Sequence, residues 1–338
     1  MTKERKIKST ENYTPVLGLL ETERAIKYLK DFFEKKLSNE LNLVRVSAPL
    51  FVSSNSGLND NLNGVERPVS FDIKQTGEIA EVVHSLAKWK RYALHRYNMP
   101  PSCGIYTDMN AIRRDEKTDE LHSLYVDQWD WEKVITAKDR NIEYLKDTVR
   151  KIYSAVYSTN SALKRKFKGL NLKLPREITF ITSQELEDKY PSLSPSEREN
   201  VFAKECGAVF VMQIGCKLRS GAVHDGRAPD YDDWQLNGDI LIYYPPLKRA
   251  VEISSMGIRV DAESLLRQLE ISGQQERISL PFHSALLSGE LPLTIGGGIG
   301  QSRLCMLILN KVHVGEVQAS LWPAQSLDTL KKSNITLL

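Results

Sequence analysis

Apolar residues recur at helical spacing in several parts of the chain. Ile26, Leu29 and Phe33 follow one another at intervals of three and four, while lysines and glutamates fill the other side, so we expect a helix over residues 21–41. Similar patterns predict a long helix over residues 138–167 and a helix that starts at residue 194 with a capping box. A further helix is predicted over residues 261–272, where the next residue, a glycine, ends it.

Other segments alternate between apolar and polar residues with a period of two, which is typical of strands. Residues 42–52 show this pattern, and Pro49 within them cannot donate a ladder hydrogen bond, so we expect it at an edge or a strand end. Further strands are predicted, the last two forming a hairpin, over 178–182, 208–214, 239–244 and 251–255.

The order of these elements predicts the fold class. Strands come in runs with helices grouped between them, which favours an α+β fold with a largely antiparallel sheet flanked by helices. No internal repeat or linker interrupts residues 21–338, and residues 1–20 are polar with mixed charge. We therefore expect an N-terminal arm over 1–20 and a single domain over the remainder.

Composition limits the classes of binding partner and the cellular compartment that we expect for this protein. Lys plus Arg number 46 against 43 Asp plus Glu, and a net charge of +3 offers no basic face for nucleic acid. Four cysteines without paired spacing argue against a disulfide scaffold. No apolar run approaches the roughly 20 residues that span a bilayer, and no apolar stretch follows the basic N-terminus as in a secretory signal. We expect a cytoplasmic protein without a membrane partner.

Glycines gather at 296–300, just before an arginine. The run lacks the lysine of a phosphate-binding P-loop, and Arg303 stands where a dinucleotide turn has its third glycine. A strand-to-helix turn remains, in which the backbone of Gly298 and Gly300 approaches a flat ligand and the Arg303 guanidinium pairs with phosphate or stacks on a base. A flexible glycine loop is the alternative.

Acidic, amide and aromatic side chains alternate in the segment that follows the arginine-acid pair Arg113 and Glu116. Alternation divides them between two faces: Gln128, Asp130 and Glu132 on one, and Asp127, Trp129 and Trp131 on the other. A polar face beside tryptophans is costly to bury without a partner. The segment therefore suggests a polar ligand, with an exposed sheet face as the alternative.

Two further clusters carry carboxylates. Residues 224–234 hold four acids and an arginine, which form either a solvated loop or a receptor for an ammonium group or metal. Asp239 and Glu252, on neighbouring predicted strands, offer the oxygen ligands that suit Mg²⁺ bridging phosphate oxygens, with a structural ion pair as the alternative.

The order of these motifs resembles the catalytic domains of class II aminoacyl-tRNA synthetases, which begin with a proline-bearing strand and end with a glycine-arginine motif. A closer resemblance, to ammonia-dependent asparagine synthetases, runs from about residue 42 to 325. Six blocks carry it: 83–91, 125–132, 227–234, 236–241, 254–261 and 295–304.

This resemblance implies a homodimer that makes asparagine from aspartate, ammonia and ATP with Mg²⁺. The side-chain carboxylate of aspartate attacks the α-phosphorus, giving β-aspartyl-adenylate and pyrophosphate, and ammonia then displaces AMP. A free carboxylate is a poor acyl donor because its leaving group would be oxide. Adenylation replaces that leaving group with AMP, while the enzyme holds back water.

For ATP, the resemblance implies that Arg113 and Arg303 grip the phosphates as catalytic residues. Asp239 and Glu252 would hold Mg²⁺. The other residues implied at the ATP site are Glu116, Gly298 and Gly300.

For aspartate, the resemblance implies that Asp60 and Asp232 receive the ammonium group and that Lys90 pairs with the α-carboxylate. Asp130 would orient or deprotonate the incoming ammonium, and Gln128 would act with it as a catalytic residue. The remaining contacts to the substrate would come from Gln128, Ser85, Ser255 and Arg259.

Rival classes need features that we do not find. An aspartyl- or asparaginyl-tRNA synthetase would carry an anticodon-binding β-barrel before the first motif, which here begins near residue 42. A glutamine-dependent synthetase would expose an N-terminal cysteine nucleophile, and residue 2 is threonine. An inactive amino-acid-binding paralogue would lack a metal carboxylate or a phosphate arginine, and none is missing. A tRNA synthetase-like adenylating enzyme and an inactive paralogue remain the alternatives.

Overall fold

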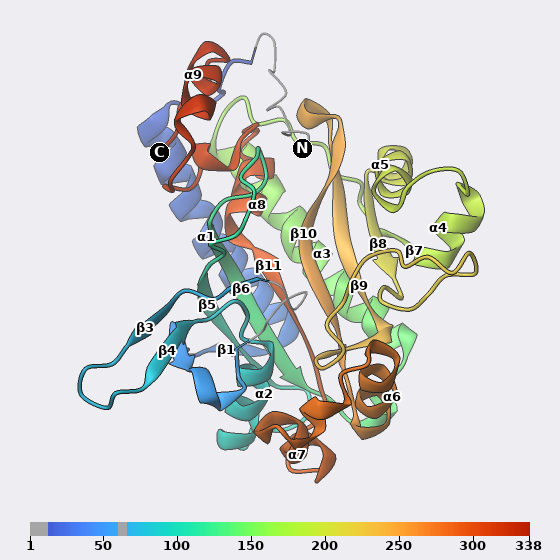
Figure 1. The fold of residues 1–338 in the computed structure, drawn as a ribbon. Helices are drawn as coiled ribbons and strands as arrows, with labels where there is room; N and C mark the ends of the chain where they lie inside the picture. The colour runs from blue at the N-terminus through green and yellow to red at the C-terminus, as the bar shows by residue number, and fades with distance from the viewer. Residues whose placement is uncertain (1–12, 60–65) are drawn as a thin grey trace.

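The protein folds around an eight-stranded sheet (Figure 1). The computed structural model describes residues 13–59 and 66–338. The strand order is β1-β5-β6-β11-β10-β9-β8-β7, in which the β1–β5 and β7–β8 pairs are parallel and the pairs between them antiparallel. The largely antiparallel α+β fold that the sequence predicts is therefore confirmed.

The elements follow in chain order. The strands are β1 (Leu43–Arg45), β2 (Phe51–Ser53), β3 (Ser70–Asp72), β4 (Ile79–Val82), β5 (Gly104–Ile112), β6 (Tyr125–Val134), β7 (Thr179–Thr182), β8 (Ala208–Met212), β9 (Asp232–Tyr244), β10 (Arg249–Arg259) and β11 (Thr294–Gly300). The helices are α1 (Leu19–Leu41), α2 (Ala87–Arg96), α3 (Ile142–Lys166), α4 (Ser183–Lys189), α5 (Pro195–Cys206), α6 (Ala262–Ser272), α7 (Pro281–Leu287), α8 (Gln301–Ile308) and α9 (Ala324–Lys332).

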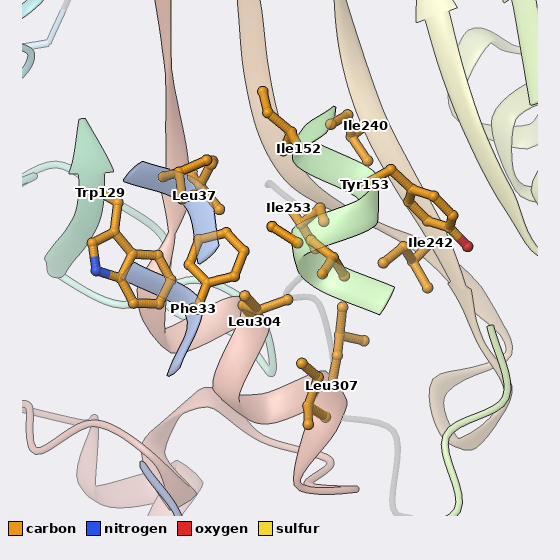
Figure 2. Packing of buried hydrophobic residues seen from close by; sticks show 14 of the residues in the cluster. Phe33, Leu37, Trp129, Ile152, Tyr153, Ile240, Ile242, Ile253, Leu304 and Leu307 are labelled. Carbon is orange, nitrogen blue, oxygen red and sulfur yellow. The ribbon is translucent and has the colours of Figure 1, made fainter. Parts of the chain in front are cut away.

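One face of the sheet is covered by α1 and α3, which pack against each other (Figure 1). Figure 2 shows Phe33 of α1 beside Trp129 of β6, and their ring centroids lie 4.5 Å apart. Farther along the same layer, Ile152 of α3 lies near Ile240 of β9 (Figure 2). Burying each large apolar side chain contributes about 1.5–3 kcal/mol, so this layer stabilises the sheet from one side.

The opposite face of the central strands carries α2, which contacts β5, β6 and β11. Arg91 of this helix is only 2% exposed, and its guanidinium donates to the carbonyls of Pro292 and Val260 at 2.8 and 2.7 Å. These bonds tie α2 to the residues just before β11 and just after β10. The neighbouring Lys90 is thereby held directly over the sheet.

The single strand predicted over 42–52 is wrong. Leu43–Arg45 forms β1 at the edge of the large sheet, the chain leaves the sheet over 46–50, and Phe51–Ser53 forms β2 in a separate sheet of order β2-β4-β3. Pro49 lies in the segment between the two strands. A residue without an N–H cannot extend the ladder, so the alternation continues through a point where the backbone pairing stops.

The predicted glycine turn is also wrong in its position. Residues 296–300 lie within β11, where they pair with β6 on one side and, up to Ile299, with β10 on the other. The chain enters α8 only after Gly300. The other predicted elements agree within a few residues, except that the two hairpin strands extend over Asp232–Tyr244 and Arg249–Arg259.

The N-terminal residues from 13 onward pack on the body of the protein. Tyr13 donates a 2.8 Å hydrogen bond to Oε1 of Glu316, and Leu17 is 1% exposed. The division into an arm over 1–20 and one domain stays a prediction, because residues 1–12 lie outside the described part. Within the described ranges, no helix is long and apolar enough to cross a membrane.

Candidate active site

Five ionised side chains form a buried row over the sheet, which we call the charge chain: Asp130, Lys90, Glu132, Arg259 and Asp232. Lys90 donates to Asp130 and, at 2.9 Å, to a backbone carbonyl of β6, and its Nζ lies 3.6 Å from Glu132. Arg259 donates to both carboxylate oxygens of Glu132 and, at 2.5 Å, to Asp232. None of the five is more than 3% exposed. Three acids and two bases leave a net charge of −1, which favours one additional cation.

Burial and ion pairing act against each other on the pKa values of these groups. Burial raises the pKa of Glu132, but Arg259 and Lys90 outweigh burial and hold the pKa below its usual range. Burial also raises the pKa of Asp232, and here the ion pair with Arg259, helped by the more distant Arg227, does not compensate. Glu132 is therefore a fixed anion, whereas Asp232 is the carboxylate that gains most from another cation.

The glycines of β11 make room for two side chains of β6. A methyl group at Gly296 would overlap the Glu132 carboxylate, and one at Gly298 would overlap the Gln128 amide oxygen. Glu132 and Gln128 thus lie over glycines of the neighbouring strand, where any larger residue would displace them. The glycine run serves the side chains across the ladder, and the turn that we predicted from it is not needed.

A cleft in two parts opens over β9 and β10, and we call it the two-part cleft. One part, of about 390 Å³, is lined among others by Arg113, Glu116, Ser255 and Glu252. The other part, of about 420 Å³, is lined among others by Asp239, Glu252 and Arg303. Glu252 borders both parts, so the two arginines lie on either side of one carboxylate. Their ion pairs are loose, at 3.8 Å between Arg113 and Glu116 and 3.7 Å between Arg303 and Glu252.

One row of the sheet links the cleft to the charge chain. Asp239 of β9 pairs with Ser255 of β10, Ser255 with Gly298 of β11, and Gly298 with Asp130 of β6. Residues paired directly across a sheet point to the same face, and neighbouring strands lie about 4.8 Å apart. Asp239 and Asp130 therefore stand on the same face, about three strand spacings apart.

Asp239 is the most perturbed acid of the cleft. Burial raises its pKa to about 7, Arg227 opposes the rise through a direct ion pair, and the neighbouring Glu252 adds to it. Its Oδ1 atom is buried and has no hydrogen-bond partner among the described residues. No group of three or more His, Cys, Asp and Glu side chains in the described ranges is placed to hold a metal ion. Two carboxylates nevertheless fit Mg²⁺, which usually takes few protein ligands and completes its shell with water and phosphate oxygens.

The structure places the remaining predicted residues around these two features. Ser85 lies just before α2, where its Oγ accepts a 3.2 Å hydrogen bond from the N–H of Ala87. Gln128 lies two residues before Asp130 on β6, and Gly300 is the residue that precedes α8. Asp60 lies outside the described residues.

Two residues of the site were not among the predicted ones. Glu132 joins Lys90 to Arg259, and Arg227 is the ion-pair partner of Asp239. Alternation along β6 had already placed Glu132 on the polar face with Gln128 and Asp130, which was a usable signal. Nothing in the sequence connects Arg227 with Asp239, because the pair forms across a loop.

Comparison with known proteins identifies close relatives. The model of the aspartate-ammonia ligase family matches residues 20–334. An aspartate–ammonia ligase of Clostridium perfringens is 61% identical over 329 residues, which is 97% of this chain and 98% of that protein. The ligase of Fusobacterium nucleatum is 63% identical over 326 residues, covering 96% of this chain and 99% of that one.

Solved structures resemble the fold at much lower identity. Asparaginyl-tRNA synthetase from Pyrococcus horikoshii, complexed with asparaginyl-adenylate, is 17% identical with a TM-score of 0.64 over 89% of this chain and 70% of that chain. The asparaginyl-tRNA synthetase from Entamoeba histolytica, also in complex with asparaginyl-adenylate, is 14% identical with a TM-score of 0.63. That match covers 89% of this chain and 66% of the synthetase chain. This chain thus spans about two thirds of each synthetase. The fold class of the class II synthetases is confirmed.

Proposed function

Because the chain belongs to the aspartate–ammonia ligase family, we propose that the two-part cleft binds ATP and that the charge chain binds aspartate and ammonium. The reaction is asparagine synthesis from aspartate, ammonia and ATP through β-aspartyl-adenylate, with release of pyrophosphate and AMP. The observation that carries the assignment of roles is the row from Asp239 to Asp130. It aligns a carboxylate for the phosphate end with a carboxylate for the nitrogen end on one face of the sheet.

In the first step, the side-chain carboxylate of aspartate attacks the α-phosphorus and pyrophosphate leaves. Arg113 would contact the α-phosphate from one part of the cleft, with Glu116 beside it, and Arg303 would contact the γ-phosphate from the other part. Guanidinium groups are always charged and match phosphate geometry, so they neutralise the charge that shifts in this transition state. Arg303 donates one hydrogen bond, to the Glu252 carbonyl at 3.1 Å, and the ion pairs with Glu116 and Glu252 are loose, so the other guanidinium donors can turn to the phosphates. The backbone at Gly298 and Gly300 would complete the ATP site.

Asp239 and Glu252 would hold Mg²⁺. Bound there, the ion would neutralise phosphate charge as pyrophosphate departs. Burial raises the pKa of Asp239 despite its ion pair with Arg227, and its Oδ1 has no hydrogen-bond partner among the described residues, so this carboxylate can take a further cation. A metal would supply that cation and favour the ionised form.

Aspartate would bind by exchanging partners within the charge chain. Lys90 contacts Asp130 in the structure, and we propose that the substrate α-carboxylate replaces Asp130 at the Lys90 ammonium. Asp232, whose pKa burial raises, would receive the substrate α-ammonium group. The α-ammonium and α-carboxylate groups cancel, so the net charge of −1 is left for the incoming ammonium ion. Ser85, Gln128, Ser255 and Arg259 would complete the aspartate site, together with Asp60.

The released Asp130 then has a role in the second step. Its carboxylate would bind the incoming ammonium and take one proton, which leaves ammonia to attack the activated carbonyl. The new C–N bond forms, the C–O bond to AMP breaks, and nitrogen passes a further proton to the departing AMP phosphate or to water to give the amide. Gln128, two residues along β6, would orient the carbonyl.

The assignment is tested by product analysis. Purified protein with aspartate, ATP, Mg²⁺ and ammonium is expected to yield asparagine and AMP in equal amounts. It should also exchange labelled pyrophosphate into ATP, with aspartate present and without any effect of added tRNA. Formation of ADP, or exchange that requires tRNA, would overturn the proposal in favour of another ATP-dependent ligase or a tRNA synthetase.

We also propose that the enzyme is a cytoplasmic homodimer. Strand β1 lies at the edge of the large sheet, and Val44 within it and Leu50 next to Pro49 are 60% and 53% exposed. An edge strand with exposed apolar side chains is suited to pairing with a second copy. The four cysteines are free thiols, in keeping with a reducing compartment. Sedimentation equilibrium should give twice the mass of the chain.

A further inference from the structure

We propose that Asp127 is a positioning residue that fixes Arg303 at the start of α8. The inference rests on the phosphate-binding role proposed for Arg303. Asp127 belongs to β6 but points to the face opposite the charge chain, with Trp129 and Trp131. It is 7% exposed and takes no part in the chemistry described above.

Helix α8 has an unusual beginning. The first backbone N–H groups of a helix have no partner within it and are commonly satisfied by the side chain of the preceding residue. That residue here is Gly300, which has no side chain, and no cap hydrogen bond is made from its position. Asp127 takes over this task from the neighbouring strand: its Oδ1 accepts from the N–H of Ser302 at 3.0 Å, and its Oδ2 accepts from the Ser302 hydroxyl at 2.8 Å.

The capping carboxylate is itself held from two sides. Nε2 of Gln318 donates to Asp127 at 3.2 Å and to the Ser302 hydroxyl at 3.0 Å. Nζ of Lys30, from α1, lies 3.4 Å from the other carboxylate oxygen. A negative charge at a helix N-terminus is also favoured by the helix dipole. Asp127 thus connects α1, β6 and the C-terminal segment to the first turn of α8.

Arg303 directly follows Ser302 in α8. The position and rotation of the first helical turn relative to the sheet therefore determine where the Arg303 guanidinium enters the cleft. Gln301 provides a second anchor, since its Nε2 donates to Asp108 of β5 at 2.9 Å. The two residues before Arg303 are therefore held by carboxylates of adjacent strands, Asp108 of β5 and Asp127 of β6.

The test is a double-mutant cycle on aspartate-dependent pyrophosphate exchange. Asp127→Asn keeps the shape but removes the charge and one acceptor, and we expect KM for ATP to rise about tenfold, the value of one charge-assisted hydrogen bond. KM for aspartate should stay within about twofold, because the charge chain lies on the other face. In an Arg303→Ala background, Asp127→Asn should change KM for ATP by less than about twofold.

Two further variants keep the outcome interpretable. Ser302→Ala removes the hydroxyl contacts with Asp127 and Gln318 but keeps the backbone N–H bond to Asp127. It should raise KM for ATP about threefold, and it serves as the test variant if Asp127→Asn fails to fold. Asp188→Asn, on α4, breaks an exposed ion pair with Arg219 and should change neither KM for ATP nor KM for aspartate. Equal effects of Asp127→Asn in the presence and absence of Arg303 would overturn the inference, and so would a parallel rise in both KM values. Wild-type protein without exchange, or normal exchange by Arg303→Ala, would instead refute the proposed function on which it rests.

Discussion

The charge chain and the two-part cleft both collect acids and bases, but they hold them differently. In the charge chain no member is more than 3% exposed, and both cations lie between two carboxylates. In the cleft, the side chains of Arg113 and Arg303 are 30% and 23% exposed, and their nearest carboxylates are 3.8 and 3.7 Å away. One region is closed and internally satisfied, whereas the other is open and under-satisfied.

The difference follows from what each region is proposed to bind. Aspartate carries one ammonium group and two carboxylates, so a preset row of charges can take it by exchanging partners. ATP brings several negative charges and a metal ion, which supply the partners that the cleft lacks. Buried charges must be paired before the ligand arrives, whereas water can solvate exposed arginines until then.

The largest expected effect is on stability in the charge chain. Glu132→Gln leaves Lys90 and Arg259 buried with one carboxylate each, and we expect the free energy of unfolding to fall by about 3–5 kcal/mol. Glu116→Gln in the cleft is the matched control, with an expected change below about 1 kcal/mol. Denaturant unfolding of both variants measures the difference. Equal changes would mean that the two regions hold their charges alike.

The next effect is on activity in the cleft. Arg303→Ala removes a donor that acts on phosphate in the transition state, so the barrier should rise by about 2–4 kcal/mol, which is roughly a hundredfold to a thousandfold loss of turnover. The free energy of unfolding should change by less than about 1 kcal/mol, since the pair with Glu252 is loose. Stopped assays together with unfolding curves check both statements. A large loss of stability with little loss of turnover would exchange the roles of the two regions.

The pH dependence of the free energy of unfolding tests whether the charge chain is the first part of the protein to lose stability in acid. Burial lowers the pKa of His313 from 6.5 to about 4, and its Nδ1 accepts a 3.0 Å hydrogen bond from the N–H of Gly315. The unfolded chain therefore binds the proton first, and stability present above pH 6.5 is lost as the pH falls toward 4, by up to about 3 kcal/mol. Glu132, with a lowered pKa, loses its contribution only below its usual range.

His313→Gln separates these two sources. Glutamine can still accept from Gly315 but does not titrate, so the variant should show a flatter stability profile between pH 6.5 and 4.5 than the wild type. The measurement is the free energy of unfolding at several pH values. A profile as steep as that of the wild type would show that His313 is not the acid-sensitive group.

Local pattern was enough to predict parts of both regions. Period-two alternation along β6 separated Gln128, Asp130 and Glu132 from the tryptophans, and the structure has the same division. Alternation failed over 42–52, because the side-chain pattern continues past Pro49 while the backbone pairing does not. Glycines carry no apolar or polar pattern, so the glycine run predicts a turn where the structure has strand β11.

Distant contacts were beyond the reach of the sequence. Arg259 meets Glu132 across 127 residues, and Asp127 caps Ser302 across 175. Which acid pairs with which base depends on the register of β6, β11, β10 and β9 and on the position of α2 over them. Spacing along the chain cannot supply that register, so the sequence does not assign Glu132 and Arg227 to the site.

The smallest expected effect lies where the two regions meet. A methyl group at Gly298 would overlap the Gln128 amide, which is the free end of a side chain, whereas one at Gly297 would come within 2.7 Å of the backbone carbonyl of Ser255. Gly298→Ala should therefore displace Gln128 and raise KM for aspartate about tenfold, with the free energy of unfolding changed by less than about 1 kcal/mol. Gly297→Ala is the matched variant, and overpacking against backbone should cost about 1–3 kcal/mol of stability.

Steady-state kinetics and denaturant unfolding of this pair locate the border between the regions. If Gly298→Ala loses as much stability as Gly297→Ala, then Gln128 is held as firmly as the backbone and belongs with the closed charge chain. If it loses only affinity for aspartate, then Gln128 moves freely and the border runs between it and Glu132, four residues apart on one strand. The contrast between a closed and an open region would then be set by side-chain pairing alone, since β6 supplies the same rigid backbone to both.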